Sequence, residues 1–377
     1  MNKFKNISKK NEIIYFFKKN NKKRILIISG RNSYYKSGAK NLINKINFLS
    51  VKILLKKNFY PETKELKYLL KETYKFKPDL IIAIGGGSVL DYSKIINILK
   101  IEDLNNLEKK IKNNLFQNNS KNFYLIAIPT TAGSGAEVTS NAVMYINKKK
   151  YSFEGKNLVP DKYFLCPDFL IKNPKKIKAS SGFDAISQSV ESILSLKSNN
   201  MSLSYAKQSL GLSINNFINF VKKPNYENRS KMIISAHFSG KAISISKTIA
   251  PHAVSYPFTS YYGISHGHAV SINLEKFLLF NFKNLNQSDS NFNLNHRFKI
   301  LFSFFNVKNI NDLCSKISYI KKNANLQDDY KKLGININKD IDKITNGVNI
   351  LRLKNNPVKL NKNDLKNIIS NNTIKFF

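Results

Sequence analysis

The chain has few cysteines and no long apolar run, and each shortage excludes a class of protein. Cys166 and Cys314 are too few for a disulfide framework and form no CxxC pair, which is typical of a reducing cytoplasm. No apolar run approaches the ~20 residues of a membrane-spanning helix. The N-terminal segment has basic residues but neither a long apolar stretch nor a small-residue cleavage site, so it does not resemble a secretory signal. We therefore expect a cytoplasmic protein with no membrane partner.

Arginine is also scarce, although the formal net charge is +38. Five of the 62 basic residues are arginine and the other 57 are lysine, spread along the whole chain. Arginine is the residue that reads bases and clamps phosphates through two hydrogen bonds at once. We therefore expect no specific nucleic-acid partner, although so positive a chain would attract anionic substrates and cofactors.

The first half of the chain alternates short apolar runs with amphipathic stretches. This alternation predicts an α/β domain with a Rossmann-like parallel sheet, which binds ligands beyond the carboxyl ends of its strands. A hairpin within 143–151 and a return strand at 163–165 would follow. The expected strands are 24–29, 52–55, 80–84 and 123–128, and the expected helices are 39–46, 62–74 and 88–99.

After Pro174 the periodicity becomes helical almost throughout, which predicts an all-α second domain. The boundary is expected near residue 178, giving a dinucleotide-binding α/β domain over 1–178 and a helical metal and substrate domain over 179–377. The expected helices are 183–195, 202–221, 229–246, 265–282 and 298–305, with an exposed loop at 283–295 and short helices after 323.

Two loops rich in small residues follow neighbouring predicted strands. The strand 80–84 runs into Gly85-Gly86-Gly87-Ser88, and a helical stretch containing Asp91 follows. Backbone N–H groups of such a loop can approach a phosphate without interference from a Cβ, and the helix N-terminus favours negative charge. The second loop, Pro129-Thr130-Thr131-Ala132-Gly133-Ser134-Gly135-Ala136-Glu137, can line a nucleotide with its hydroxyls. An ordinary tight turn between a strand and a helix needs only one glycine. Two loops rich in small residues after neighbouring strands therefore favour a nucleotide site over ordinary turns.

Together these loops resemble those of the iron-containing alcohol dehydrogenase family, with GGGSVLD standing for GGGSxxD and PTTAGSGAEVT for a PTTxGTGSE-like segment. The resemblance extends from Arg24 to Ala269 and implies the dehydroquinate synthase-like fold of that family. It also implies an NAD(P) cofactor, with its pyrophosphate on the glycine loop and its base near the second loop. The cofactor-binding residues would include Gly86, Gly87, Ser88, Asp91, Thr130, Thr131, Ser134 and Lys150.

Three of the five histidines, His252, His266 and His268, fall within seventeen residues, which core histidines rarely do. The family binds a divalent metal, usually iron, through one aspartate and three histidines. The resemblance places Asp184, His252 and His266 among these ligands. Gln188 stands where the family has its other histidine, and an amide oxygen is a weaker ligand than imidazole. Two alternatives stay open: a retained metal (iron, zinc or manganese), or a site without metal.

Three further residues are candidates for catalysis. Tyr256 stands four residues after His252, where the family often has a proton-relaying histidine, and it could donate a hydrogen bond to an alkoxide. His268 could carry a proton. Lys247, which we expect on the same helical segment as His252, could hold an anionic substrate group.

The segments SKTIAPHAVSYPFTSYYGISHGHAV and FDAISQSVES resemble the phosphonoacetaldehyde reductase branch of the family. That branch implies NAD(P)H-dependent reduction of phosphonoacetaldehyde to 2-hydroxyethylphosphonate, a step in phosphonate biosynthesis. The turn after the first strand, with Gly30, Arg31 and Ser33, has no acid to repel a 2′-phosphate, which favours NADPH over NADH.

Other readings remain at this point. A general alcohol dehydrogenase, a metal-free reductase of dicarboxylate-type substrates or a non-catalytic nucleotide-binding relative would share these motifs. A dehydroquinate-synthase-like lyase fits less well, because that enzyme has a glutamate where Gln188 stands. The sequence does not fix the assembly, and a homodimer is one candidate.

Overall fold

The computed structural model describes residues 7–19 and 23–371. The chain divides into two compact units. The first comprises Met1–Pro174 and Asn225–Gly240, and the second comprises Lys175–Pro224 and Lys241–Phe377. The first long segment thus ends four residues before the boundary expected from the sequence, and a later segment, 225–240, groups with it.

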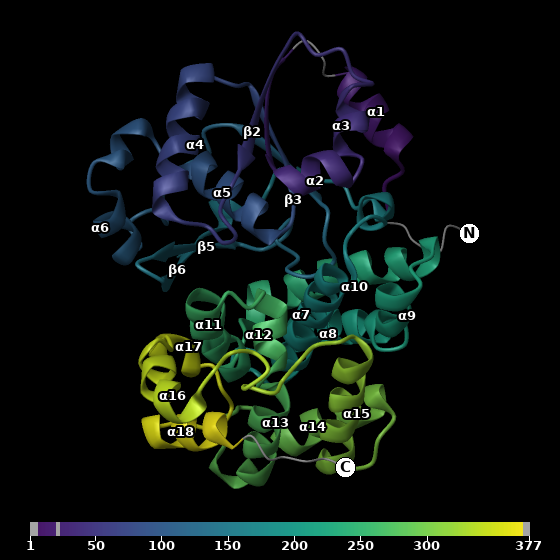
Figure 1. The fold of residues 1–377 in the computed structure, drawn as a ribbon, viewed down its shortest axis with the longest axis vertical. Helices are drawn as coiled ribbons and strands as arrows, with labels where there is room; N and C mark the ends of the chain where they lie inside the picture. Colours follow the sequence, from purple (N-terminus) through teal and green to yellow (C-terminus); the bar gives the residue numbers. More distant parts are fainter. Residues whose placement is uncertain (1–6, 20–22, 372–377) are drawn as a thin grey trace. The chain divides into compact units, whose positions relative to one another are not determined.

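The first unit contains a five-stranded parallel sheet in the order β2-β1-β3-β4-β7 (Figure 1). Its central strands are almost entirely buried, as expected for strands covered on both faces. Two residues at strand ends, Gly85 and Pro129, are partners in the register of β3 and β4, so the loops that follow these strands begin side by side. The strands are β1 (Arg24–Gly30), β2 (Ser50–Lys56), β3 (Leu80–Gly85), β4 (Tyr124–Pro129) and β7 (Lys162–Tyr163).

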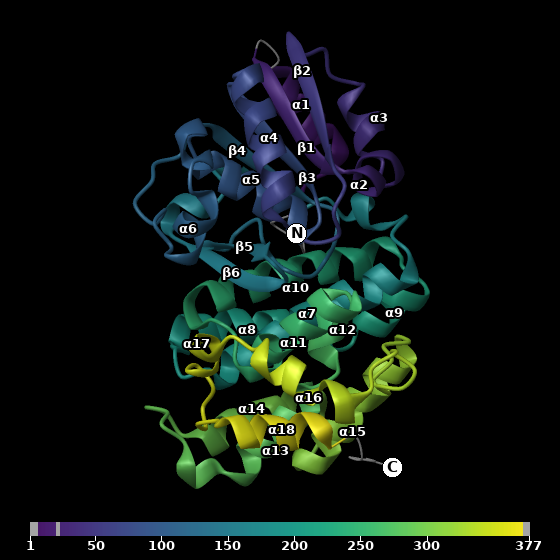
Figure 2. The same cartoon turned by 60° about the vertical axis from the view of Figure 1, so that its left-hand side comes forward.

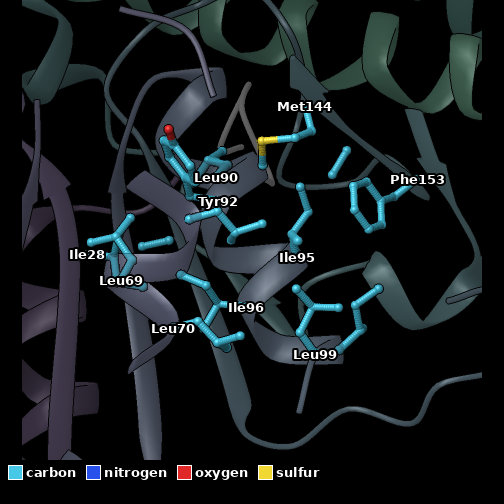
Figure 3. Close-up of a cluster of buried hydrophobic side chains, with 14 of the residues drawn as sticks. Ile28, Leu69, Leu70, Leu90, Tyr92, Ile95, Ile96, Leu99, Met144 and Phe153 are labelled. Atoms are coloured by element: carbon cyan, nitrogen blue, oxygen red, sulfur yellow. The ribbon is translucent and has the colours of Figure 1, made fainter. Parts of the chain in front are cut away.

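Helices cover both faces of this sheet (Figure 2). Because side chains alternate along each strand, Leu26 and Ile28 enter one core while Ile25 and Ile27 enter the other. Figure 3 shows the first core, where helix α5 packs against Leu69 and Leu70 of α4 and against Met144 and Phe153 of a hairpin. The helices of this unit are α1 (Lys10–Lys19), α2 (Arg31–Lys36), α3 (Ala39–Ile43), α4 (Thr63–Phe76), α5 (Gly87–Ile98), η1 (Ile101–Leu104), α6 (Leu107–Lys112), η2 (Lys156–Leu158) and η3 (Pro167–Leu170).

The hairpin consists of β5 (Asn141–Ile146) and β6 (Lys149–Glu154), which are antiparallel. Asn147 and Lys148 form its two-residue turn and both have positive φ, as a tight hairpin turn that follows the strand twist requires. The segment that returns to the sheet is β7, shorter than expected and starting one residue earlier.

Helix α10 (Tyr226–Ser246) contributes its residues up to Gly240 to the first unit for identifiable reasons. His237, fully buried, places Nδ1 3.1 Å from a carboxylate oxygen of buried Glu137 in the second small-residue loop. Gly135 of that loop has φ +59°, and a Cβ there would lie 2.5 Å from the Gly240 Cα. Two glycines therefore let the loop and the helix touch backbone to backbone.

The second unit is helical, as expected, but two of the long helices predicted from sequence are interrupted. The stretch 202–221 forms α8 and α9, and 265–282 forms α12 and α13. The helical segment expected around His252 is helix α11 at 250–262, which begins after Lys247 and contains Pro251 and Pro257. The remaining helices are α7 (Lys175–Leu194), α8 (Asn200–Ser213), α9 (Phe217–Lys222), α11 (Ala250–Tyr262), α12 (His266–Ser271), α13 (Leu274–Lys283), η4 (Leu285–Gln287), α14 (Leu294–Phe305), α15 (Ile310–Asn323), α16 (Ile337–Asn346), α17 (Ile350–Leu353) and α18 (Lys362–Ser370). Among the described residues, no helix is both long and apolar enough to cross a membrane.

Candidate functional site

The glycine loop of the first unit forms a space that side chains would fill. Gly86 is the residue before α5, and it has no side chain to cap the first amides of the helix. A Cβ on Gly86 would lie 3.2 Å from the Thr131 Oγ1, and one on Gly87 would lie 2.9 Å from the Ser134 Oγ. The glycine loop and the second loop therefore face each other closely, and a helix N-terminus in that position suits a phosphate.

The turn after β1 lies beside these two loops. Thr130 donates its backbone N–H to the Gly85 carbonyl at 2.9 Å, and its hydroxyl lies 3.3 Å from the Ser33 hydroxyl. Gly30 ends β1, and Arg31 opens the short helix α2. The structure thus gathers the predicted cofactor residues of three separate segments at one edge of the sheet.

Asp91 and Lys150, also predicted to bind the cofactor, are close enough to influence each other. Burial raises the pKa of Asp91 to about 6, while Lys94, Lys150 and a hydrogen bond from the Val143 backbone oppose the shift. The sequence analysis missed Lys94, which is fully buried and donates to the carbonyls of Thr139 and Asn141 and to the Thr139 hydroxyl. Burial lowers the pKa of Lys94 to about 8, against the attraction of Asp91 and Glu137. A lysine beside the apolar run Ile95-Ile96 of α5 was the available signal.

In the second unit, three predicted ligands come together. One ligand atom from each of Asp184, His252 and His266 lies within 4.8 Å of the other two, close enough for all three to bind one ion. Asp184 is on α7, His252 on α11 and His266 at the start of α12. Asp184 and His252 are buried and His266 is half-buried. A carboxylate and two imidazoles are a common donor set for a divalent transition metal, so these residues fit the expected group.

His252 is held from both sides. Its Nδ1 lies 2.5 Å from an oxygen of Glu191, and its Nε2 lies 3.3 Å from the Asp184 Oδ1. Burial alone would lower the pKa of His252, but the charges of Glu191 and Asp184 and the hydrogen bonds to them outweigh it and raise the pKa to about 9. When His252 is neutral, its Nδ1–H can stay on Glu191 and leave the Nε2 lone pair for a metal.

His266 is oriented by a hydroxyl. Ser255, fully buried, donates its Oγ–H to the His252 carbonyl at 2.7 Å and lies 3.4 Å from the His266 Nδ1. Because the hydroxyl proton is donated to the His252 carbonyl, the hydroxyl can accept from the His266 Nδ1–H, and the Nε2 of His266 is then the nitrogen that carries a lone pair for a metal. The ring of Tyr256 stacks on His266, with centroids 5.7 Å apart and planes 15° apart.

Gln188 lies one helical turn beyond Asp184 and faces it. Its Nε2 donates to the Asp184 Oδ2 at 3.2 Å, so the amide engages the carboxylate oxygen that His252 does not contact. Glu191 follows on the same face of α7. Sequence reasoning missed Glu191, although its spacing of seven residues from Asp184 is two helical turns and could have indicated it.

Gly267 brings α12 against α7. A Cβ at this position would overlap the Ser180 carbonyl oxygen and lie 2.7 Å from the Asp184 Cβ, so only glycine permits the approach that places His266 beside Asp184.

His268, also on α12, is not part of the group formed by Asp184, His252 and His266. Its Nε2 lies 2.6 Å from the Gln327 carbonyl oxygen. Burial lowers the pKa of His268, and the charges of Lys176 and Lys321 act in the same direction, whereas the Gln327 carbonyl and Asp328 oppose them.

The expectation that Lys247 shares a helix with His252 is wrong. Lys247 lies between α10 and α11 with φ 60°, the left-handed region that a residue with a Cβ rarely adopts. Proline at the second position of α11 starts a new helix after this kink.

Comparison with known proteins places these features in a family. The family model described as iron-containing alcohol dehydrogenase matches residues 7–167, and the model of the C-terminal part of the same family matches residues 178–373. The chain belongs to the iron-containing alcohol dehydrogenase family.

The chain is similar to several individual members of known function. The chain is 28% identical over 220 residues to the phosphonoacetaldehyde reductase of Streptomyces viridochromogenes, covering 56% of each chain. It is 29% identical over 215 residues to the 4-hydroxybutyrate dehydrogenase of Clostridium kluyveri, covering 55% of this chain and 56% of that one. The matches thus span little more than half the length of these relatives. The crystal structure of sulfoacetaldehyde reductase from Bifidobacterium kashiwanohense in complex with NAD+ has the same fold, with a TM-score of 0.81 and 24% identity over 96% of this chain and 94% of that one.

Proposed function

We propose that the chain catalyses the NAD(P)H-dependent reduction of a small anionic aldehyde to a primary alcohol, with phosphonoacetaldehyde, giving 2-hydroxyethylphosphonate, as the leading substrate. The observation that carries this proposal is the group of Asp184, His252 and His266, the first two buried, with Glu191 and Ser255 at hydrogen-bonding distance from the two imidazoles. The relatives support the substrate class, because their names contain a phosphonate, a sulfonate and a carboxylate.

Both cofactors have fitting residues. A divalent metal, iron first with zinc or manganese as alternatives, would be held by Asp184, His252 and His266 and would polarise the aldehyde carbonyl. NADPH, with NADH as the alternative, would rest on the loops of Gly86, Gly87 and Ser88 and of Thr130, Thr131 and Ser134 and would supply the hydride. In this proposal 1–178 serves the cofactor and 179–377 the metal and substrate.

The residues around the proposed metal and substrate position would have separate roles in the reaction. Glu191 and Ser255 fix the two imidazoles so that they need no rearrangement when substrate binds. Gln188 holds the second oxygen of Asp184 in place, or lends its own oxygen to the metal. Tyr256 would donate a hydrogen bond to the alkoxide as it forms. His268 would act only indirectly, because its Nε2 is engaged by the Gln327 carbonyl.

Lys247 is proposed to hold the anionic group of the substrate. Its left-handed backbone costs on the order of 1–2 kcal/mol, and such strain persists where the surroundings require one orientation of the side chain. The position immediately precedes α11, which carries His252 and Tyr256. A lysine held there would select aldehydes that carry a phosphonate or sulfonate.

A substrate panel tests the proposal. Purified protein of known metal content would be assayed with NADPH and NADH, with and without chelator, against phosphonoacetaldehyde, sulfoacetaldehyde, succinic semialdehyde and propanal. We expect kcat/KM to be highest for phosphonoacetaldehyde and activity to be lost with the metal. Lys247→Gln should raise KM for the anionic aldehydes and leave propanal unchanged. Equal activity on propanal would favour a general alcohol dehydrogenase. NADPH binding without turnover of any aldehyde would favour a non-catalytic relative.

A further inference from the structure

The second unit carries a pocket of about 990 Å³ that is separate from the metal ligands. It is lined by the beginning of α7, the end of α9, the end of α15 and the segment after α15; these helices are labelled in Figure 2. Its volume suits a ligand the size of a nucleotide. His268 lines the pocket, whereas His266 on the same short helix lies with Asp184 and His252.

The lining is strongly basic. Six of its sixteen residues are lysines, and none of the described lining residues is acidic. The chain as a whole has 57 lysines in 377 residues, so composition alone would place about two or three lysines in a lining of this size. The lysines come from four separate segments and are Lys175, Lys176, Lys222, Lys223, Lys322 and Lys332.

Two aspartates lie next to the pocket, against six lysines in its lining. Asp329 accepts the backbone N–H of Lys332 at 3.3 Å. Asp328 follows the lining residue Gln327, but its carboxylate lies 2.8 Å from the Nζ of buried Lys321, which also pairs with Glu275 at 2.5 Å. Lys222 donates to the side-chain oxygen of Asn323 at 2.8 Å, a neutral partner that leaves the ammonium charge in place. Ammonium groups gathered in one hollow repel each other, and a bound anion would relieve that repulsion.

We propose that this pocket binds a polyphosphate group, a run of two or three phosphates carried by a nucleotide or free in solution. Lysine ammonium groups are compact charges with three donors each, which suits phosphate oxygens approached from several directions. The remaining wall includes Val221, Leu326, Leu333 and the ring of Tyr319, an apolar surface on which a base can lie. This binding is independent of the proposed reductase activity.

Titration calorimetry with two phosphate probes tests the proposal. Inorganic tripolyphosphate and ATP, both without magnesium, would be titrated into the full chain presaturated with NADPH, so that the glycine loop is blocked. We expect one site per chain for tripolyphosphate. Tighter binding of ATP identifies a nucleotide as the natural ligand, and equal binding identifies the polyphosphate group alone. Binding heat that is seen only in protein without NADPH would place the phosphate on the glycine loop and overturn the proposal.

Two charge-matched variants separate this pocket from the general positive charge of the chain. The triple variant Lys176→Gln, Lys222→Gln, Lys332→Gln removes one exposed lysine from each of three lining segments. The control, Lys64→Gln, Lys67→Gln, Lys71→Gln, removes three exposed lysines from α4. We expect the pocket variant to weaken tripolyphosphate binding by about tenfold or more, and the control by less than about twofold. Equal losses in both variants, no saturable binding, or tighter binding of a single-stranded RNA oligonucleotide that the pocket variant abolishes would each overturn the proposal.

Discussion

Glu191 binds His252 and starts the helix on which His252 lies. One carboxylate oxygen lies 2.5 Å from the His252 Nδ1, and the other accepts the Ile249 backbone N–H at 2.9 Å. Since no side chain of Ile249 itself caps α11, Glu191 from α7 fulfils that role. The orientation of a metal ligand and the beginning of its helix therefore depend on one buried carboxylate.

Replacing Glu191 by glutamine should expose this double role. An amide has one acceptor oxygen, so Glu191→Gln can satisfy either the His252 Nδ1–H or the Ile249 N–H, but not both. We expect the metal dissociation constant to rise by about 10–100-fold, the usual cost of losing such a partner. Metal titration measures it. Glu227→Gln, on the exposed face of α10, is the control and should change nothing. Unchanged metal affinity in Glu191→Gln would refute the role.

The ligand group itself is tested by His266→Ala. Because His266 supplies one of three donors, its loss should weaken metal binding more than the loss of Glu191 and should abolish aldehyde reduction in parallel. Metal content by elemental analysis and turnover with NADPH are the two measurements. His296→Ala, an exposed histidine on α14, is the matched control. Full activity of the metal-stripped wild-type protein would contradict a catalytic metal.

The glycine loop gives a test in the first unit. Gly86 has φ −79°, which a residue with a side chain can adopt, so Gly86→Val should fold. Its side chain would meet Thr131 and occupy the space of the pyrophosphate. We expect NADPH to bind at least about tenfold more weakly, ~1.4 kcal/mol, in a fluorescence titration. Gly211→Ala, where a Cβ meets only a ring carbon of Phe304 at 3.7 Å, is the control. Wild-type affinity in Gly86→Val would show that the loop does not hold the cofactor.

The substitution Gln188→His tests whether the glutamine is adapted to catalysis. An imidazole here would face Asp184 in place of the amide and add a stronger ligand. We expect tighter metal binding without a gain in kcat/KM on phosphonoacetaldehyde, because a fourth strong ligand competes for the position that the carbonyl needs. Metal affinity and kcat/KM would be measured on both proteins. Gln208→His, exposed on α8, controls for an added histidine. A large gain in both metal affinity and kcat/KM would mean that glutamine at this position impairs the site rather than adapting it to the substrate.

The raised pKa of His252 predicts a dependence on pH. The pKa is about 9 in the metal-free fold against 6.5 for an ordinary histidine, so the stabilisation from protonation is complete below pH 6.5 and is lost as the pH rises through 9. We expect the free energy of unfolding of the metal-free protein to fall over this range. At pH 7.5, metal binding should release about one proton, measured by calorimetry in buffers of different ionisation enthalpy. Binding without proton release would show that His252 is already neutral.

The sequence predicted the repeating parts of this fold better than the contacts between distant segments. The strand cores and the glycine loop could be predicted because period and composition are local properties. The family resemblance indicated Asp184, His252 and His266, which the structure brings together. A helical segment was expected around His252, but the bounds of α11 were not predicted because it contains two prolines, although one stands in the first turn, where proline is tolerated. Glu191 and Ser255 act through partners that only the packing of α7, α11 and α12 brings near.

The grouping of 225–240 with the first unit could not be read from the sequence either. It depends on Glu137 meeting His237 and on Gly135 meeting Gly240, pairs separated by about a hundred residues. Nothing in the helical periodicity of α10 distinguishes its first fifteen residues from its last six.

The close approach at Gly267 has a consequence for how such a chain can vary. Because a methyl group there would displace α12 from α7, the position tolerates no substitution that keeps His266 beside Asp184. The same displacement would carry His268 away from the Gln327 carbonyl and open the lining of the lysine pocket. The candidate metal site and the proposed phosphate pocket thus both depend on the absence of a side chain at position 267. A single mutation there would disturb both without changing any of the residues proposed to bind a ligand.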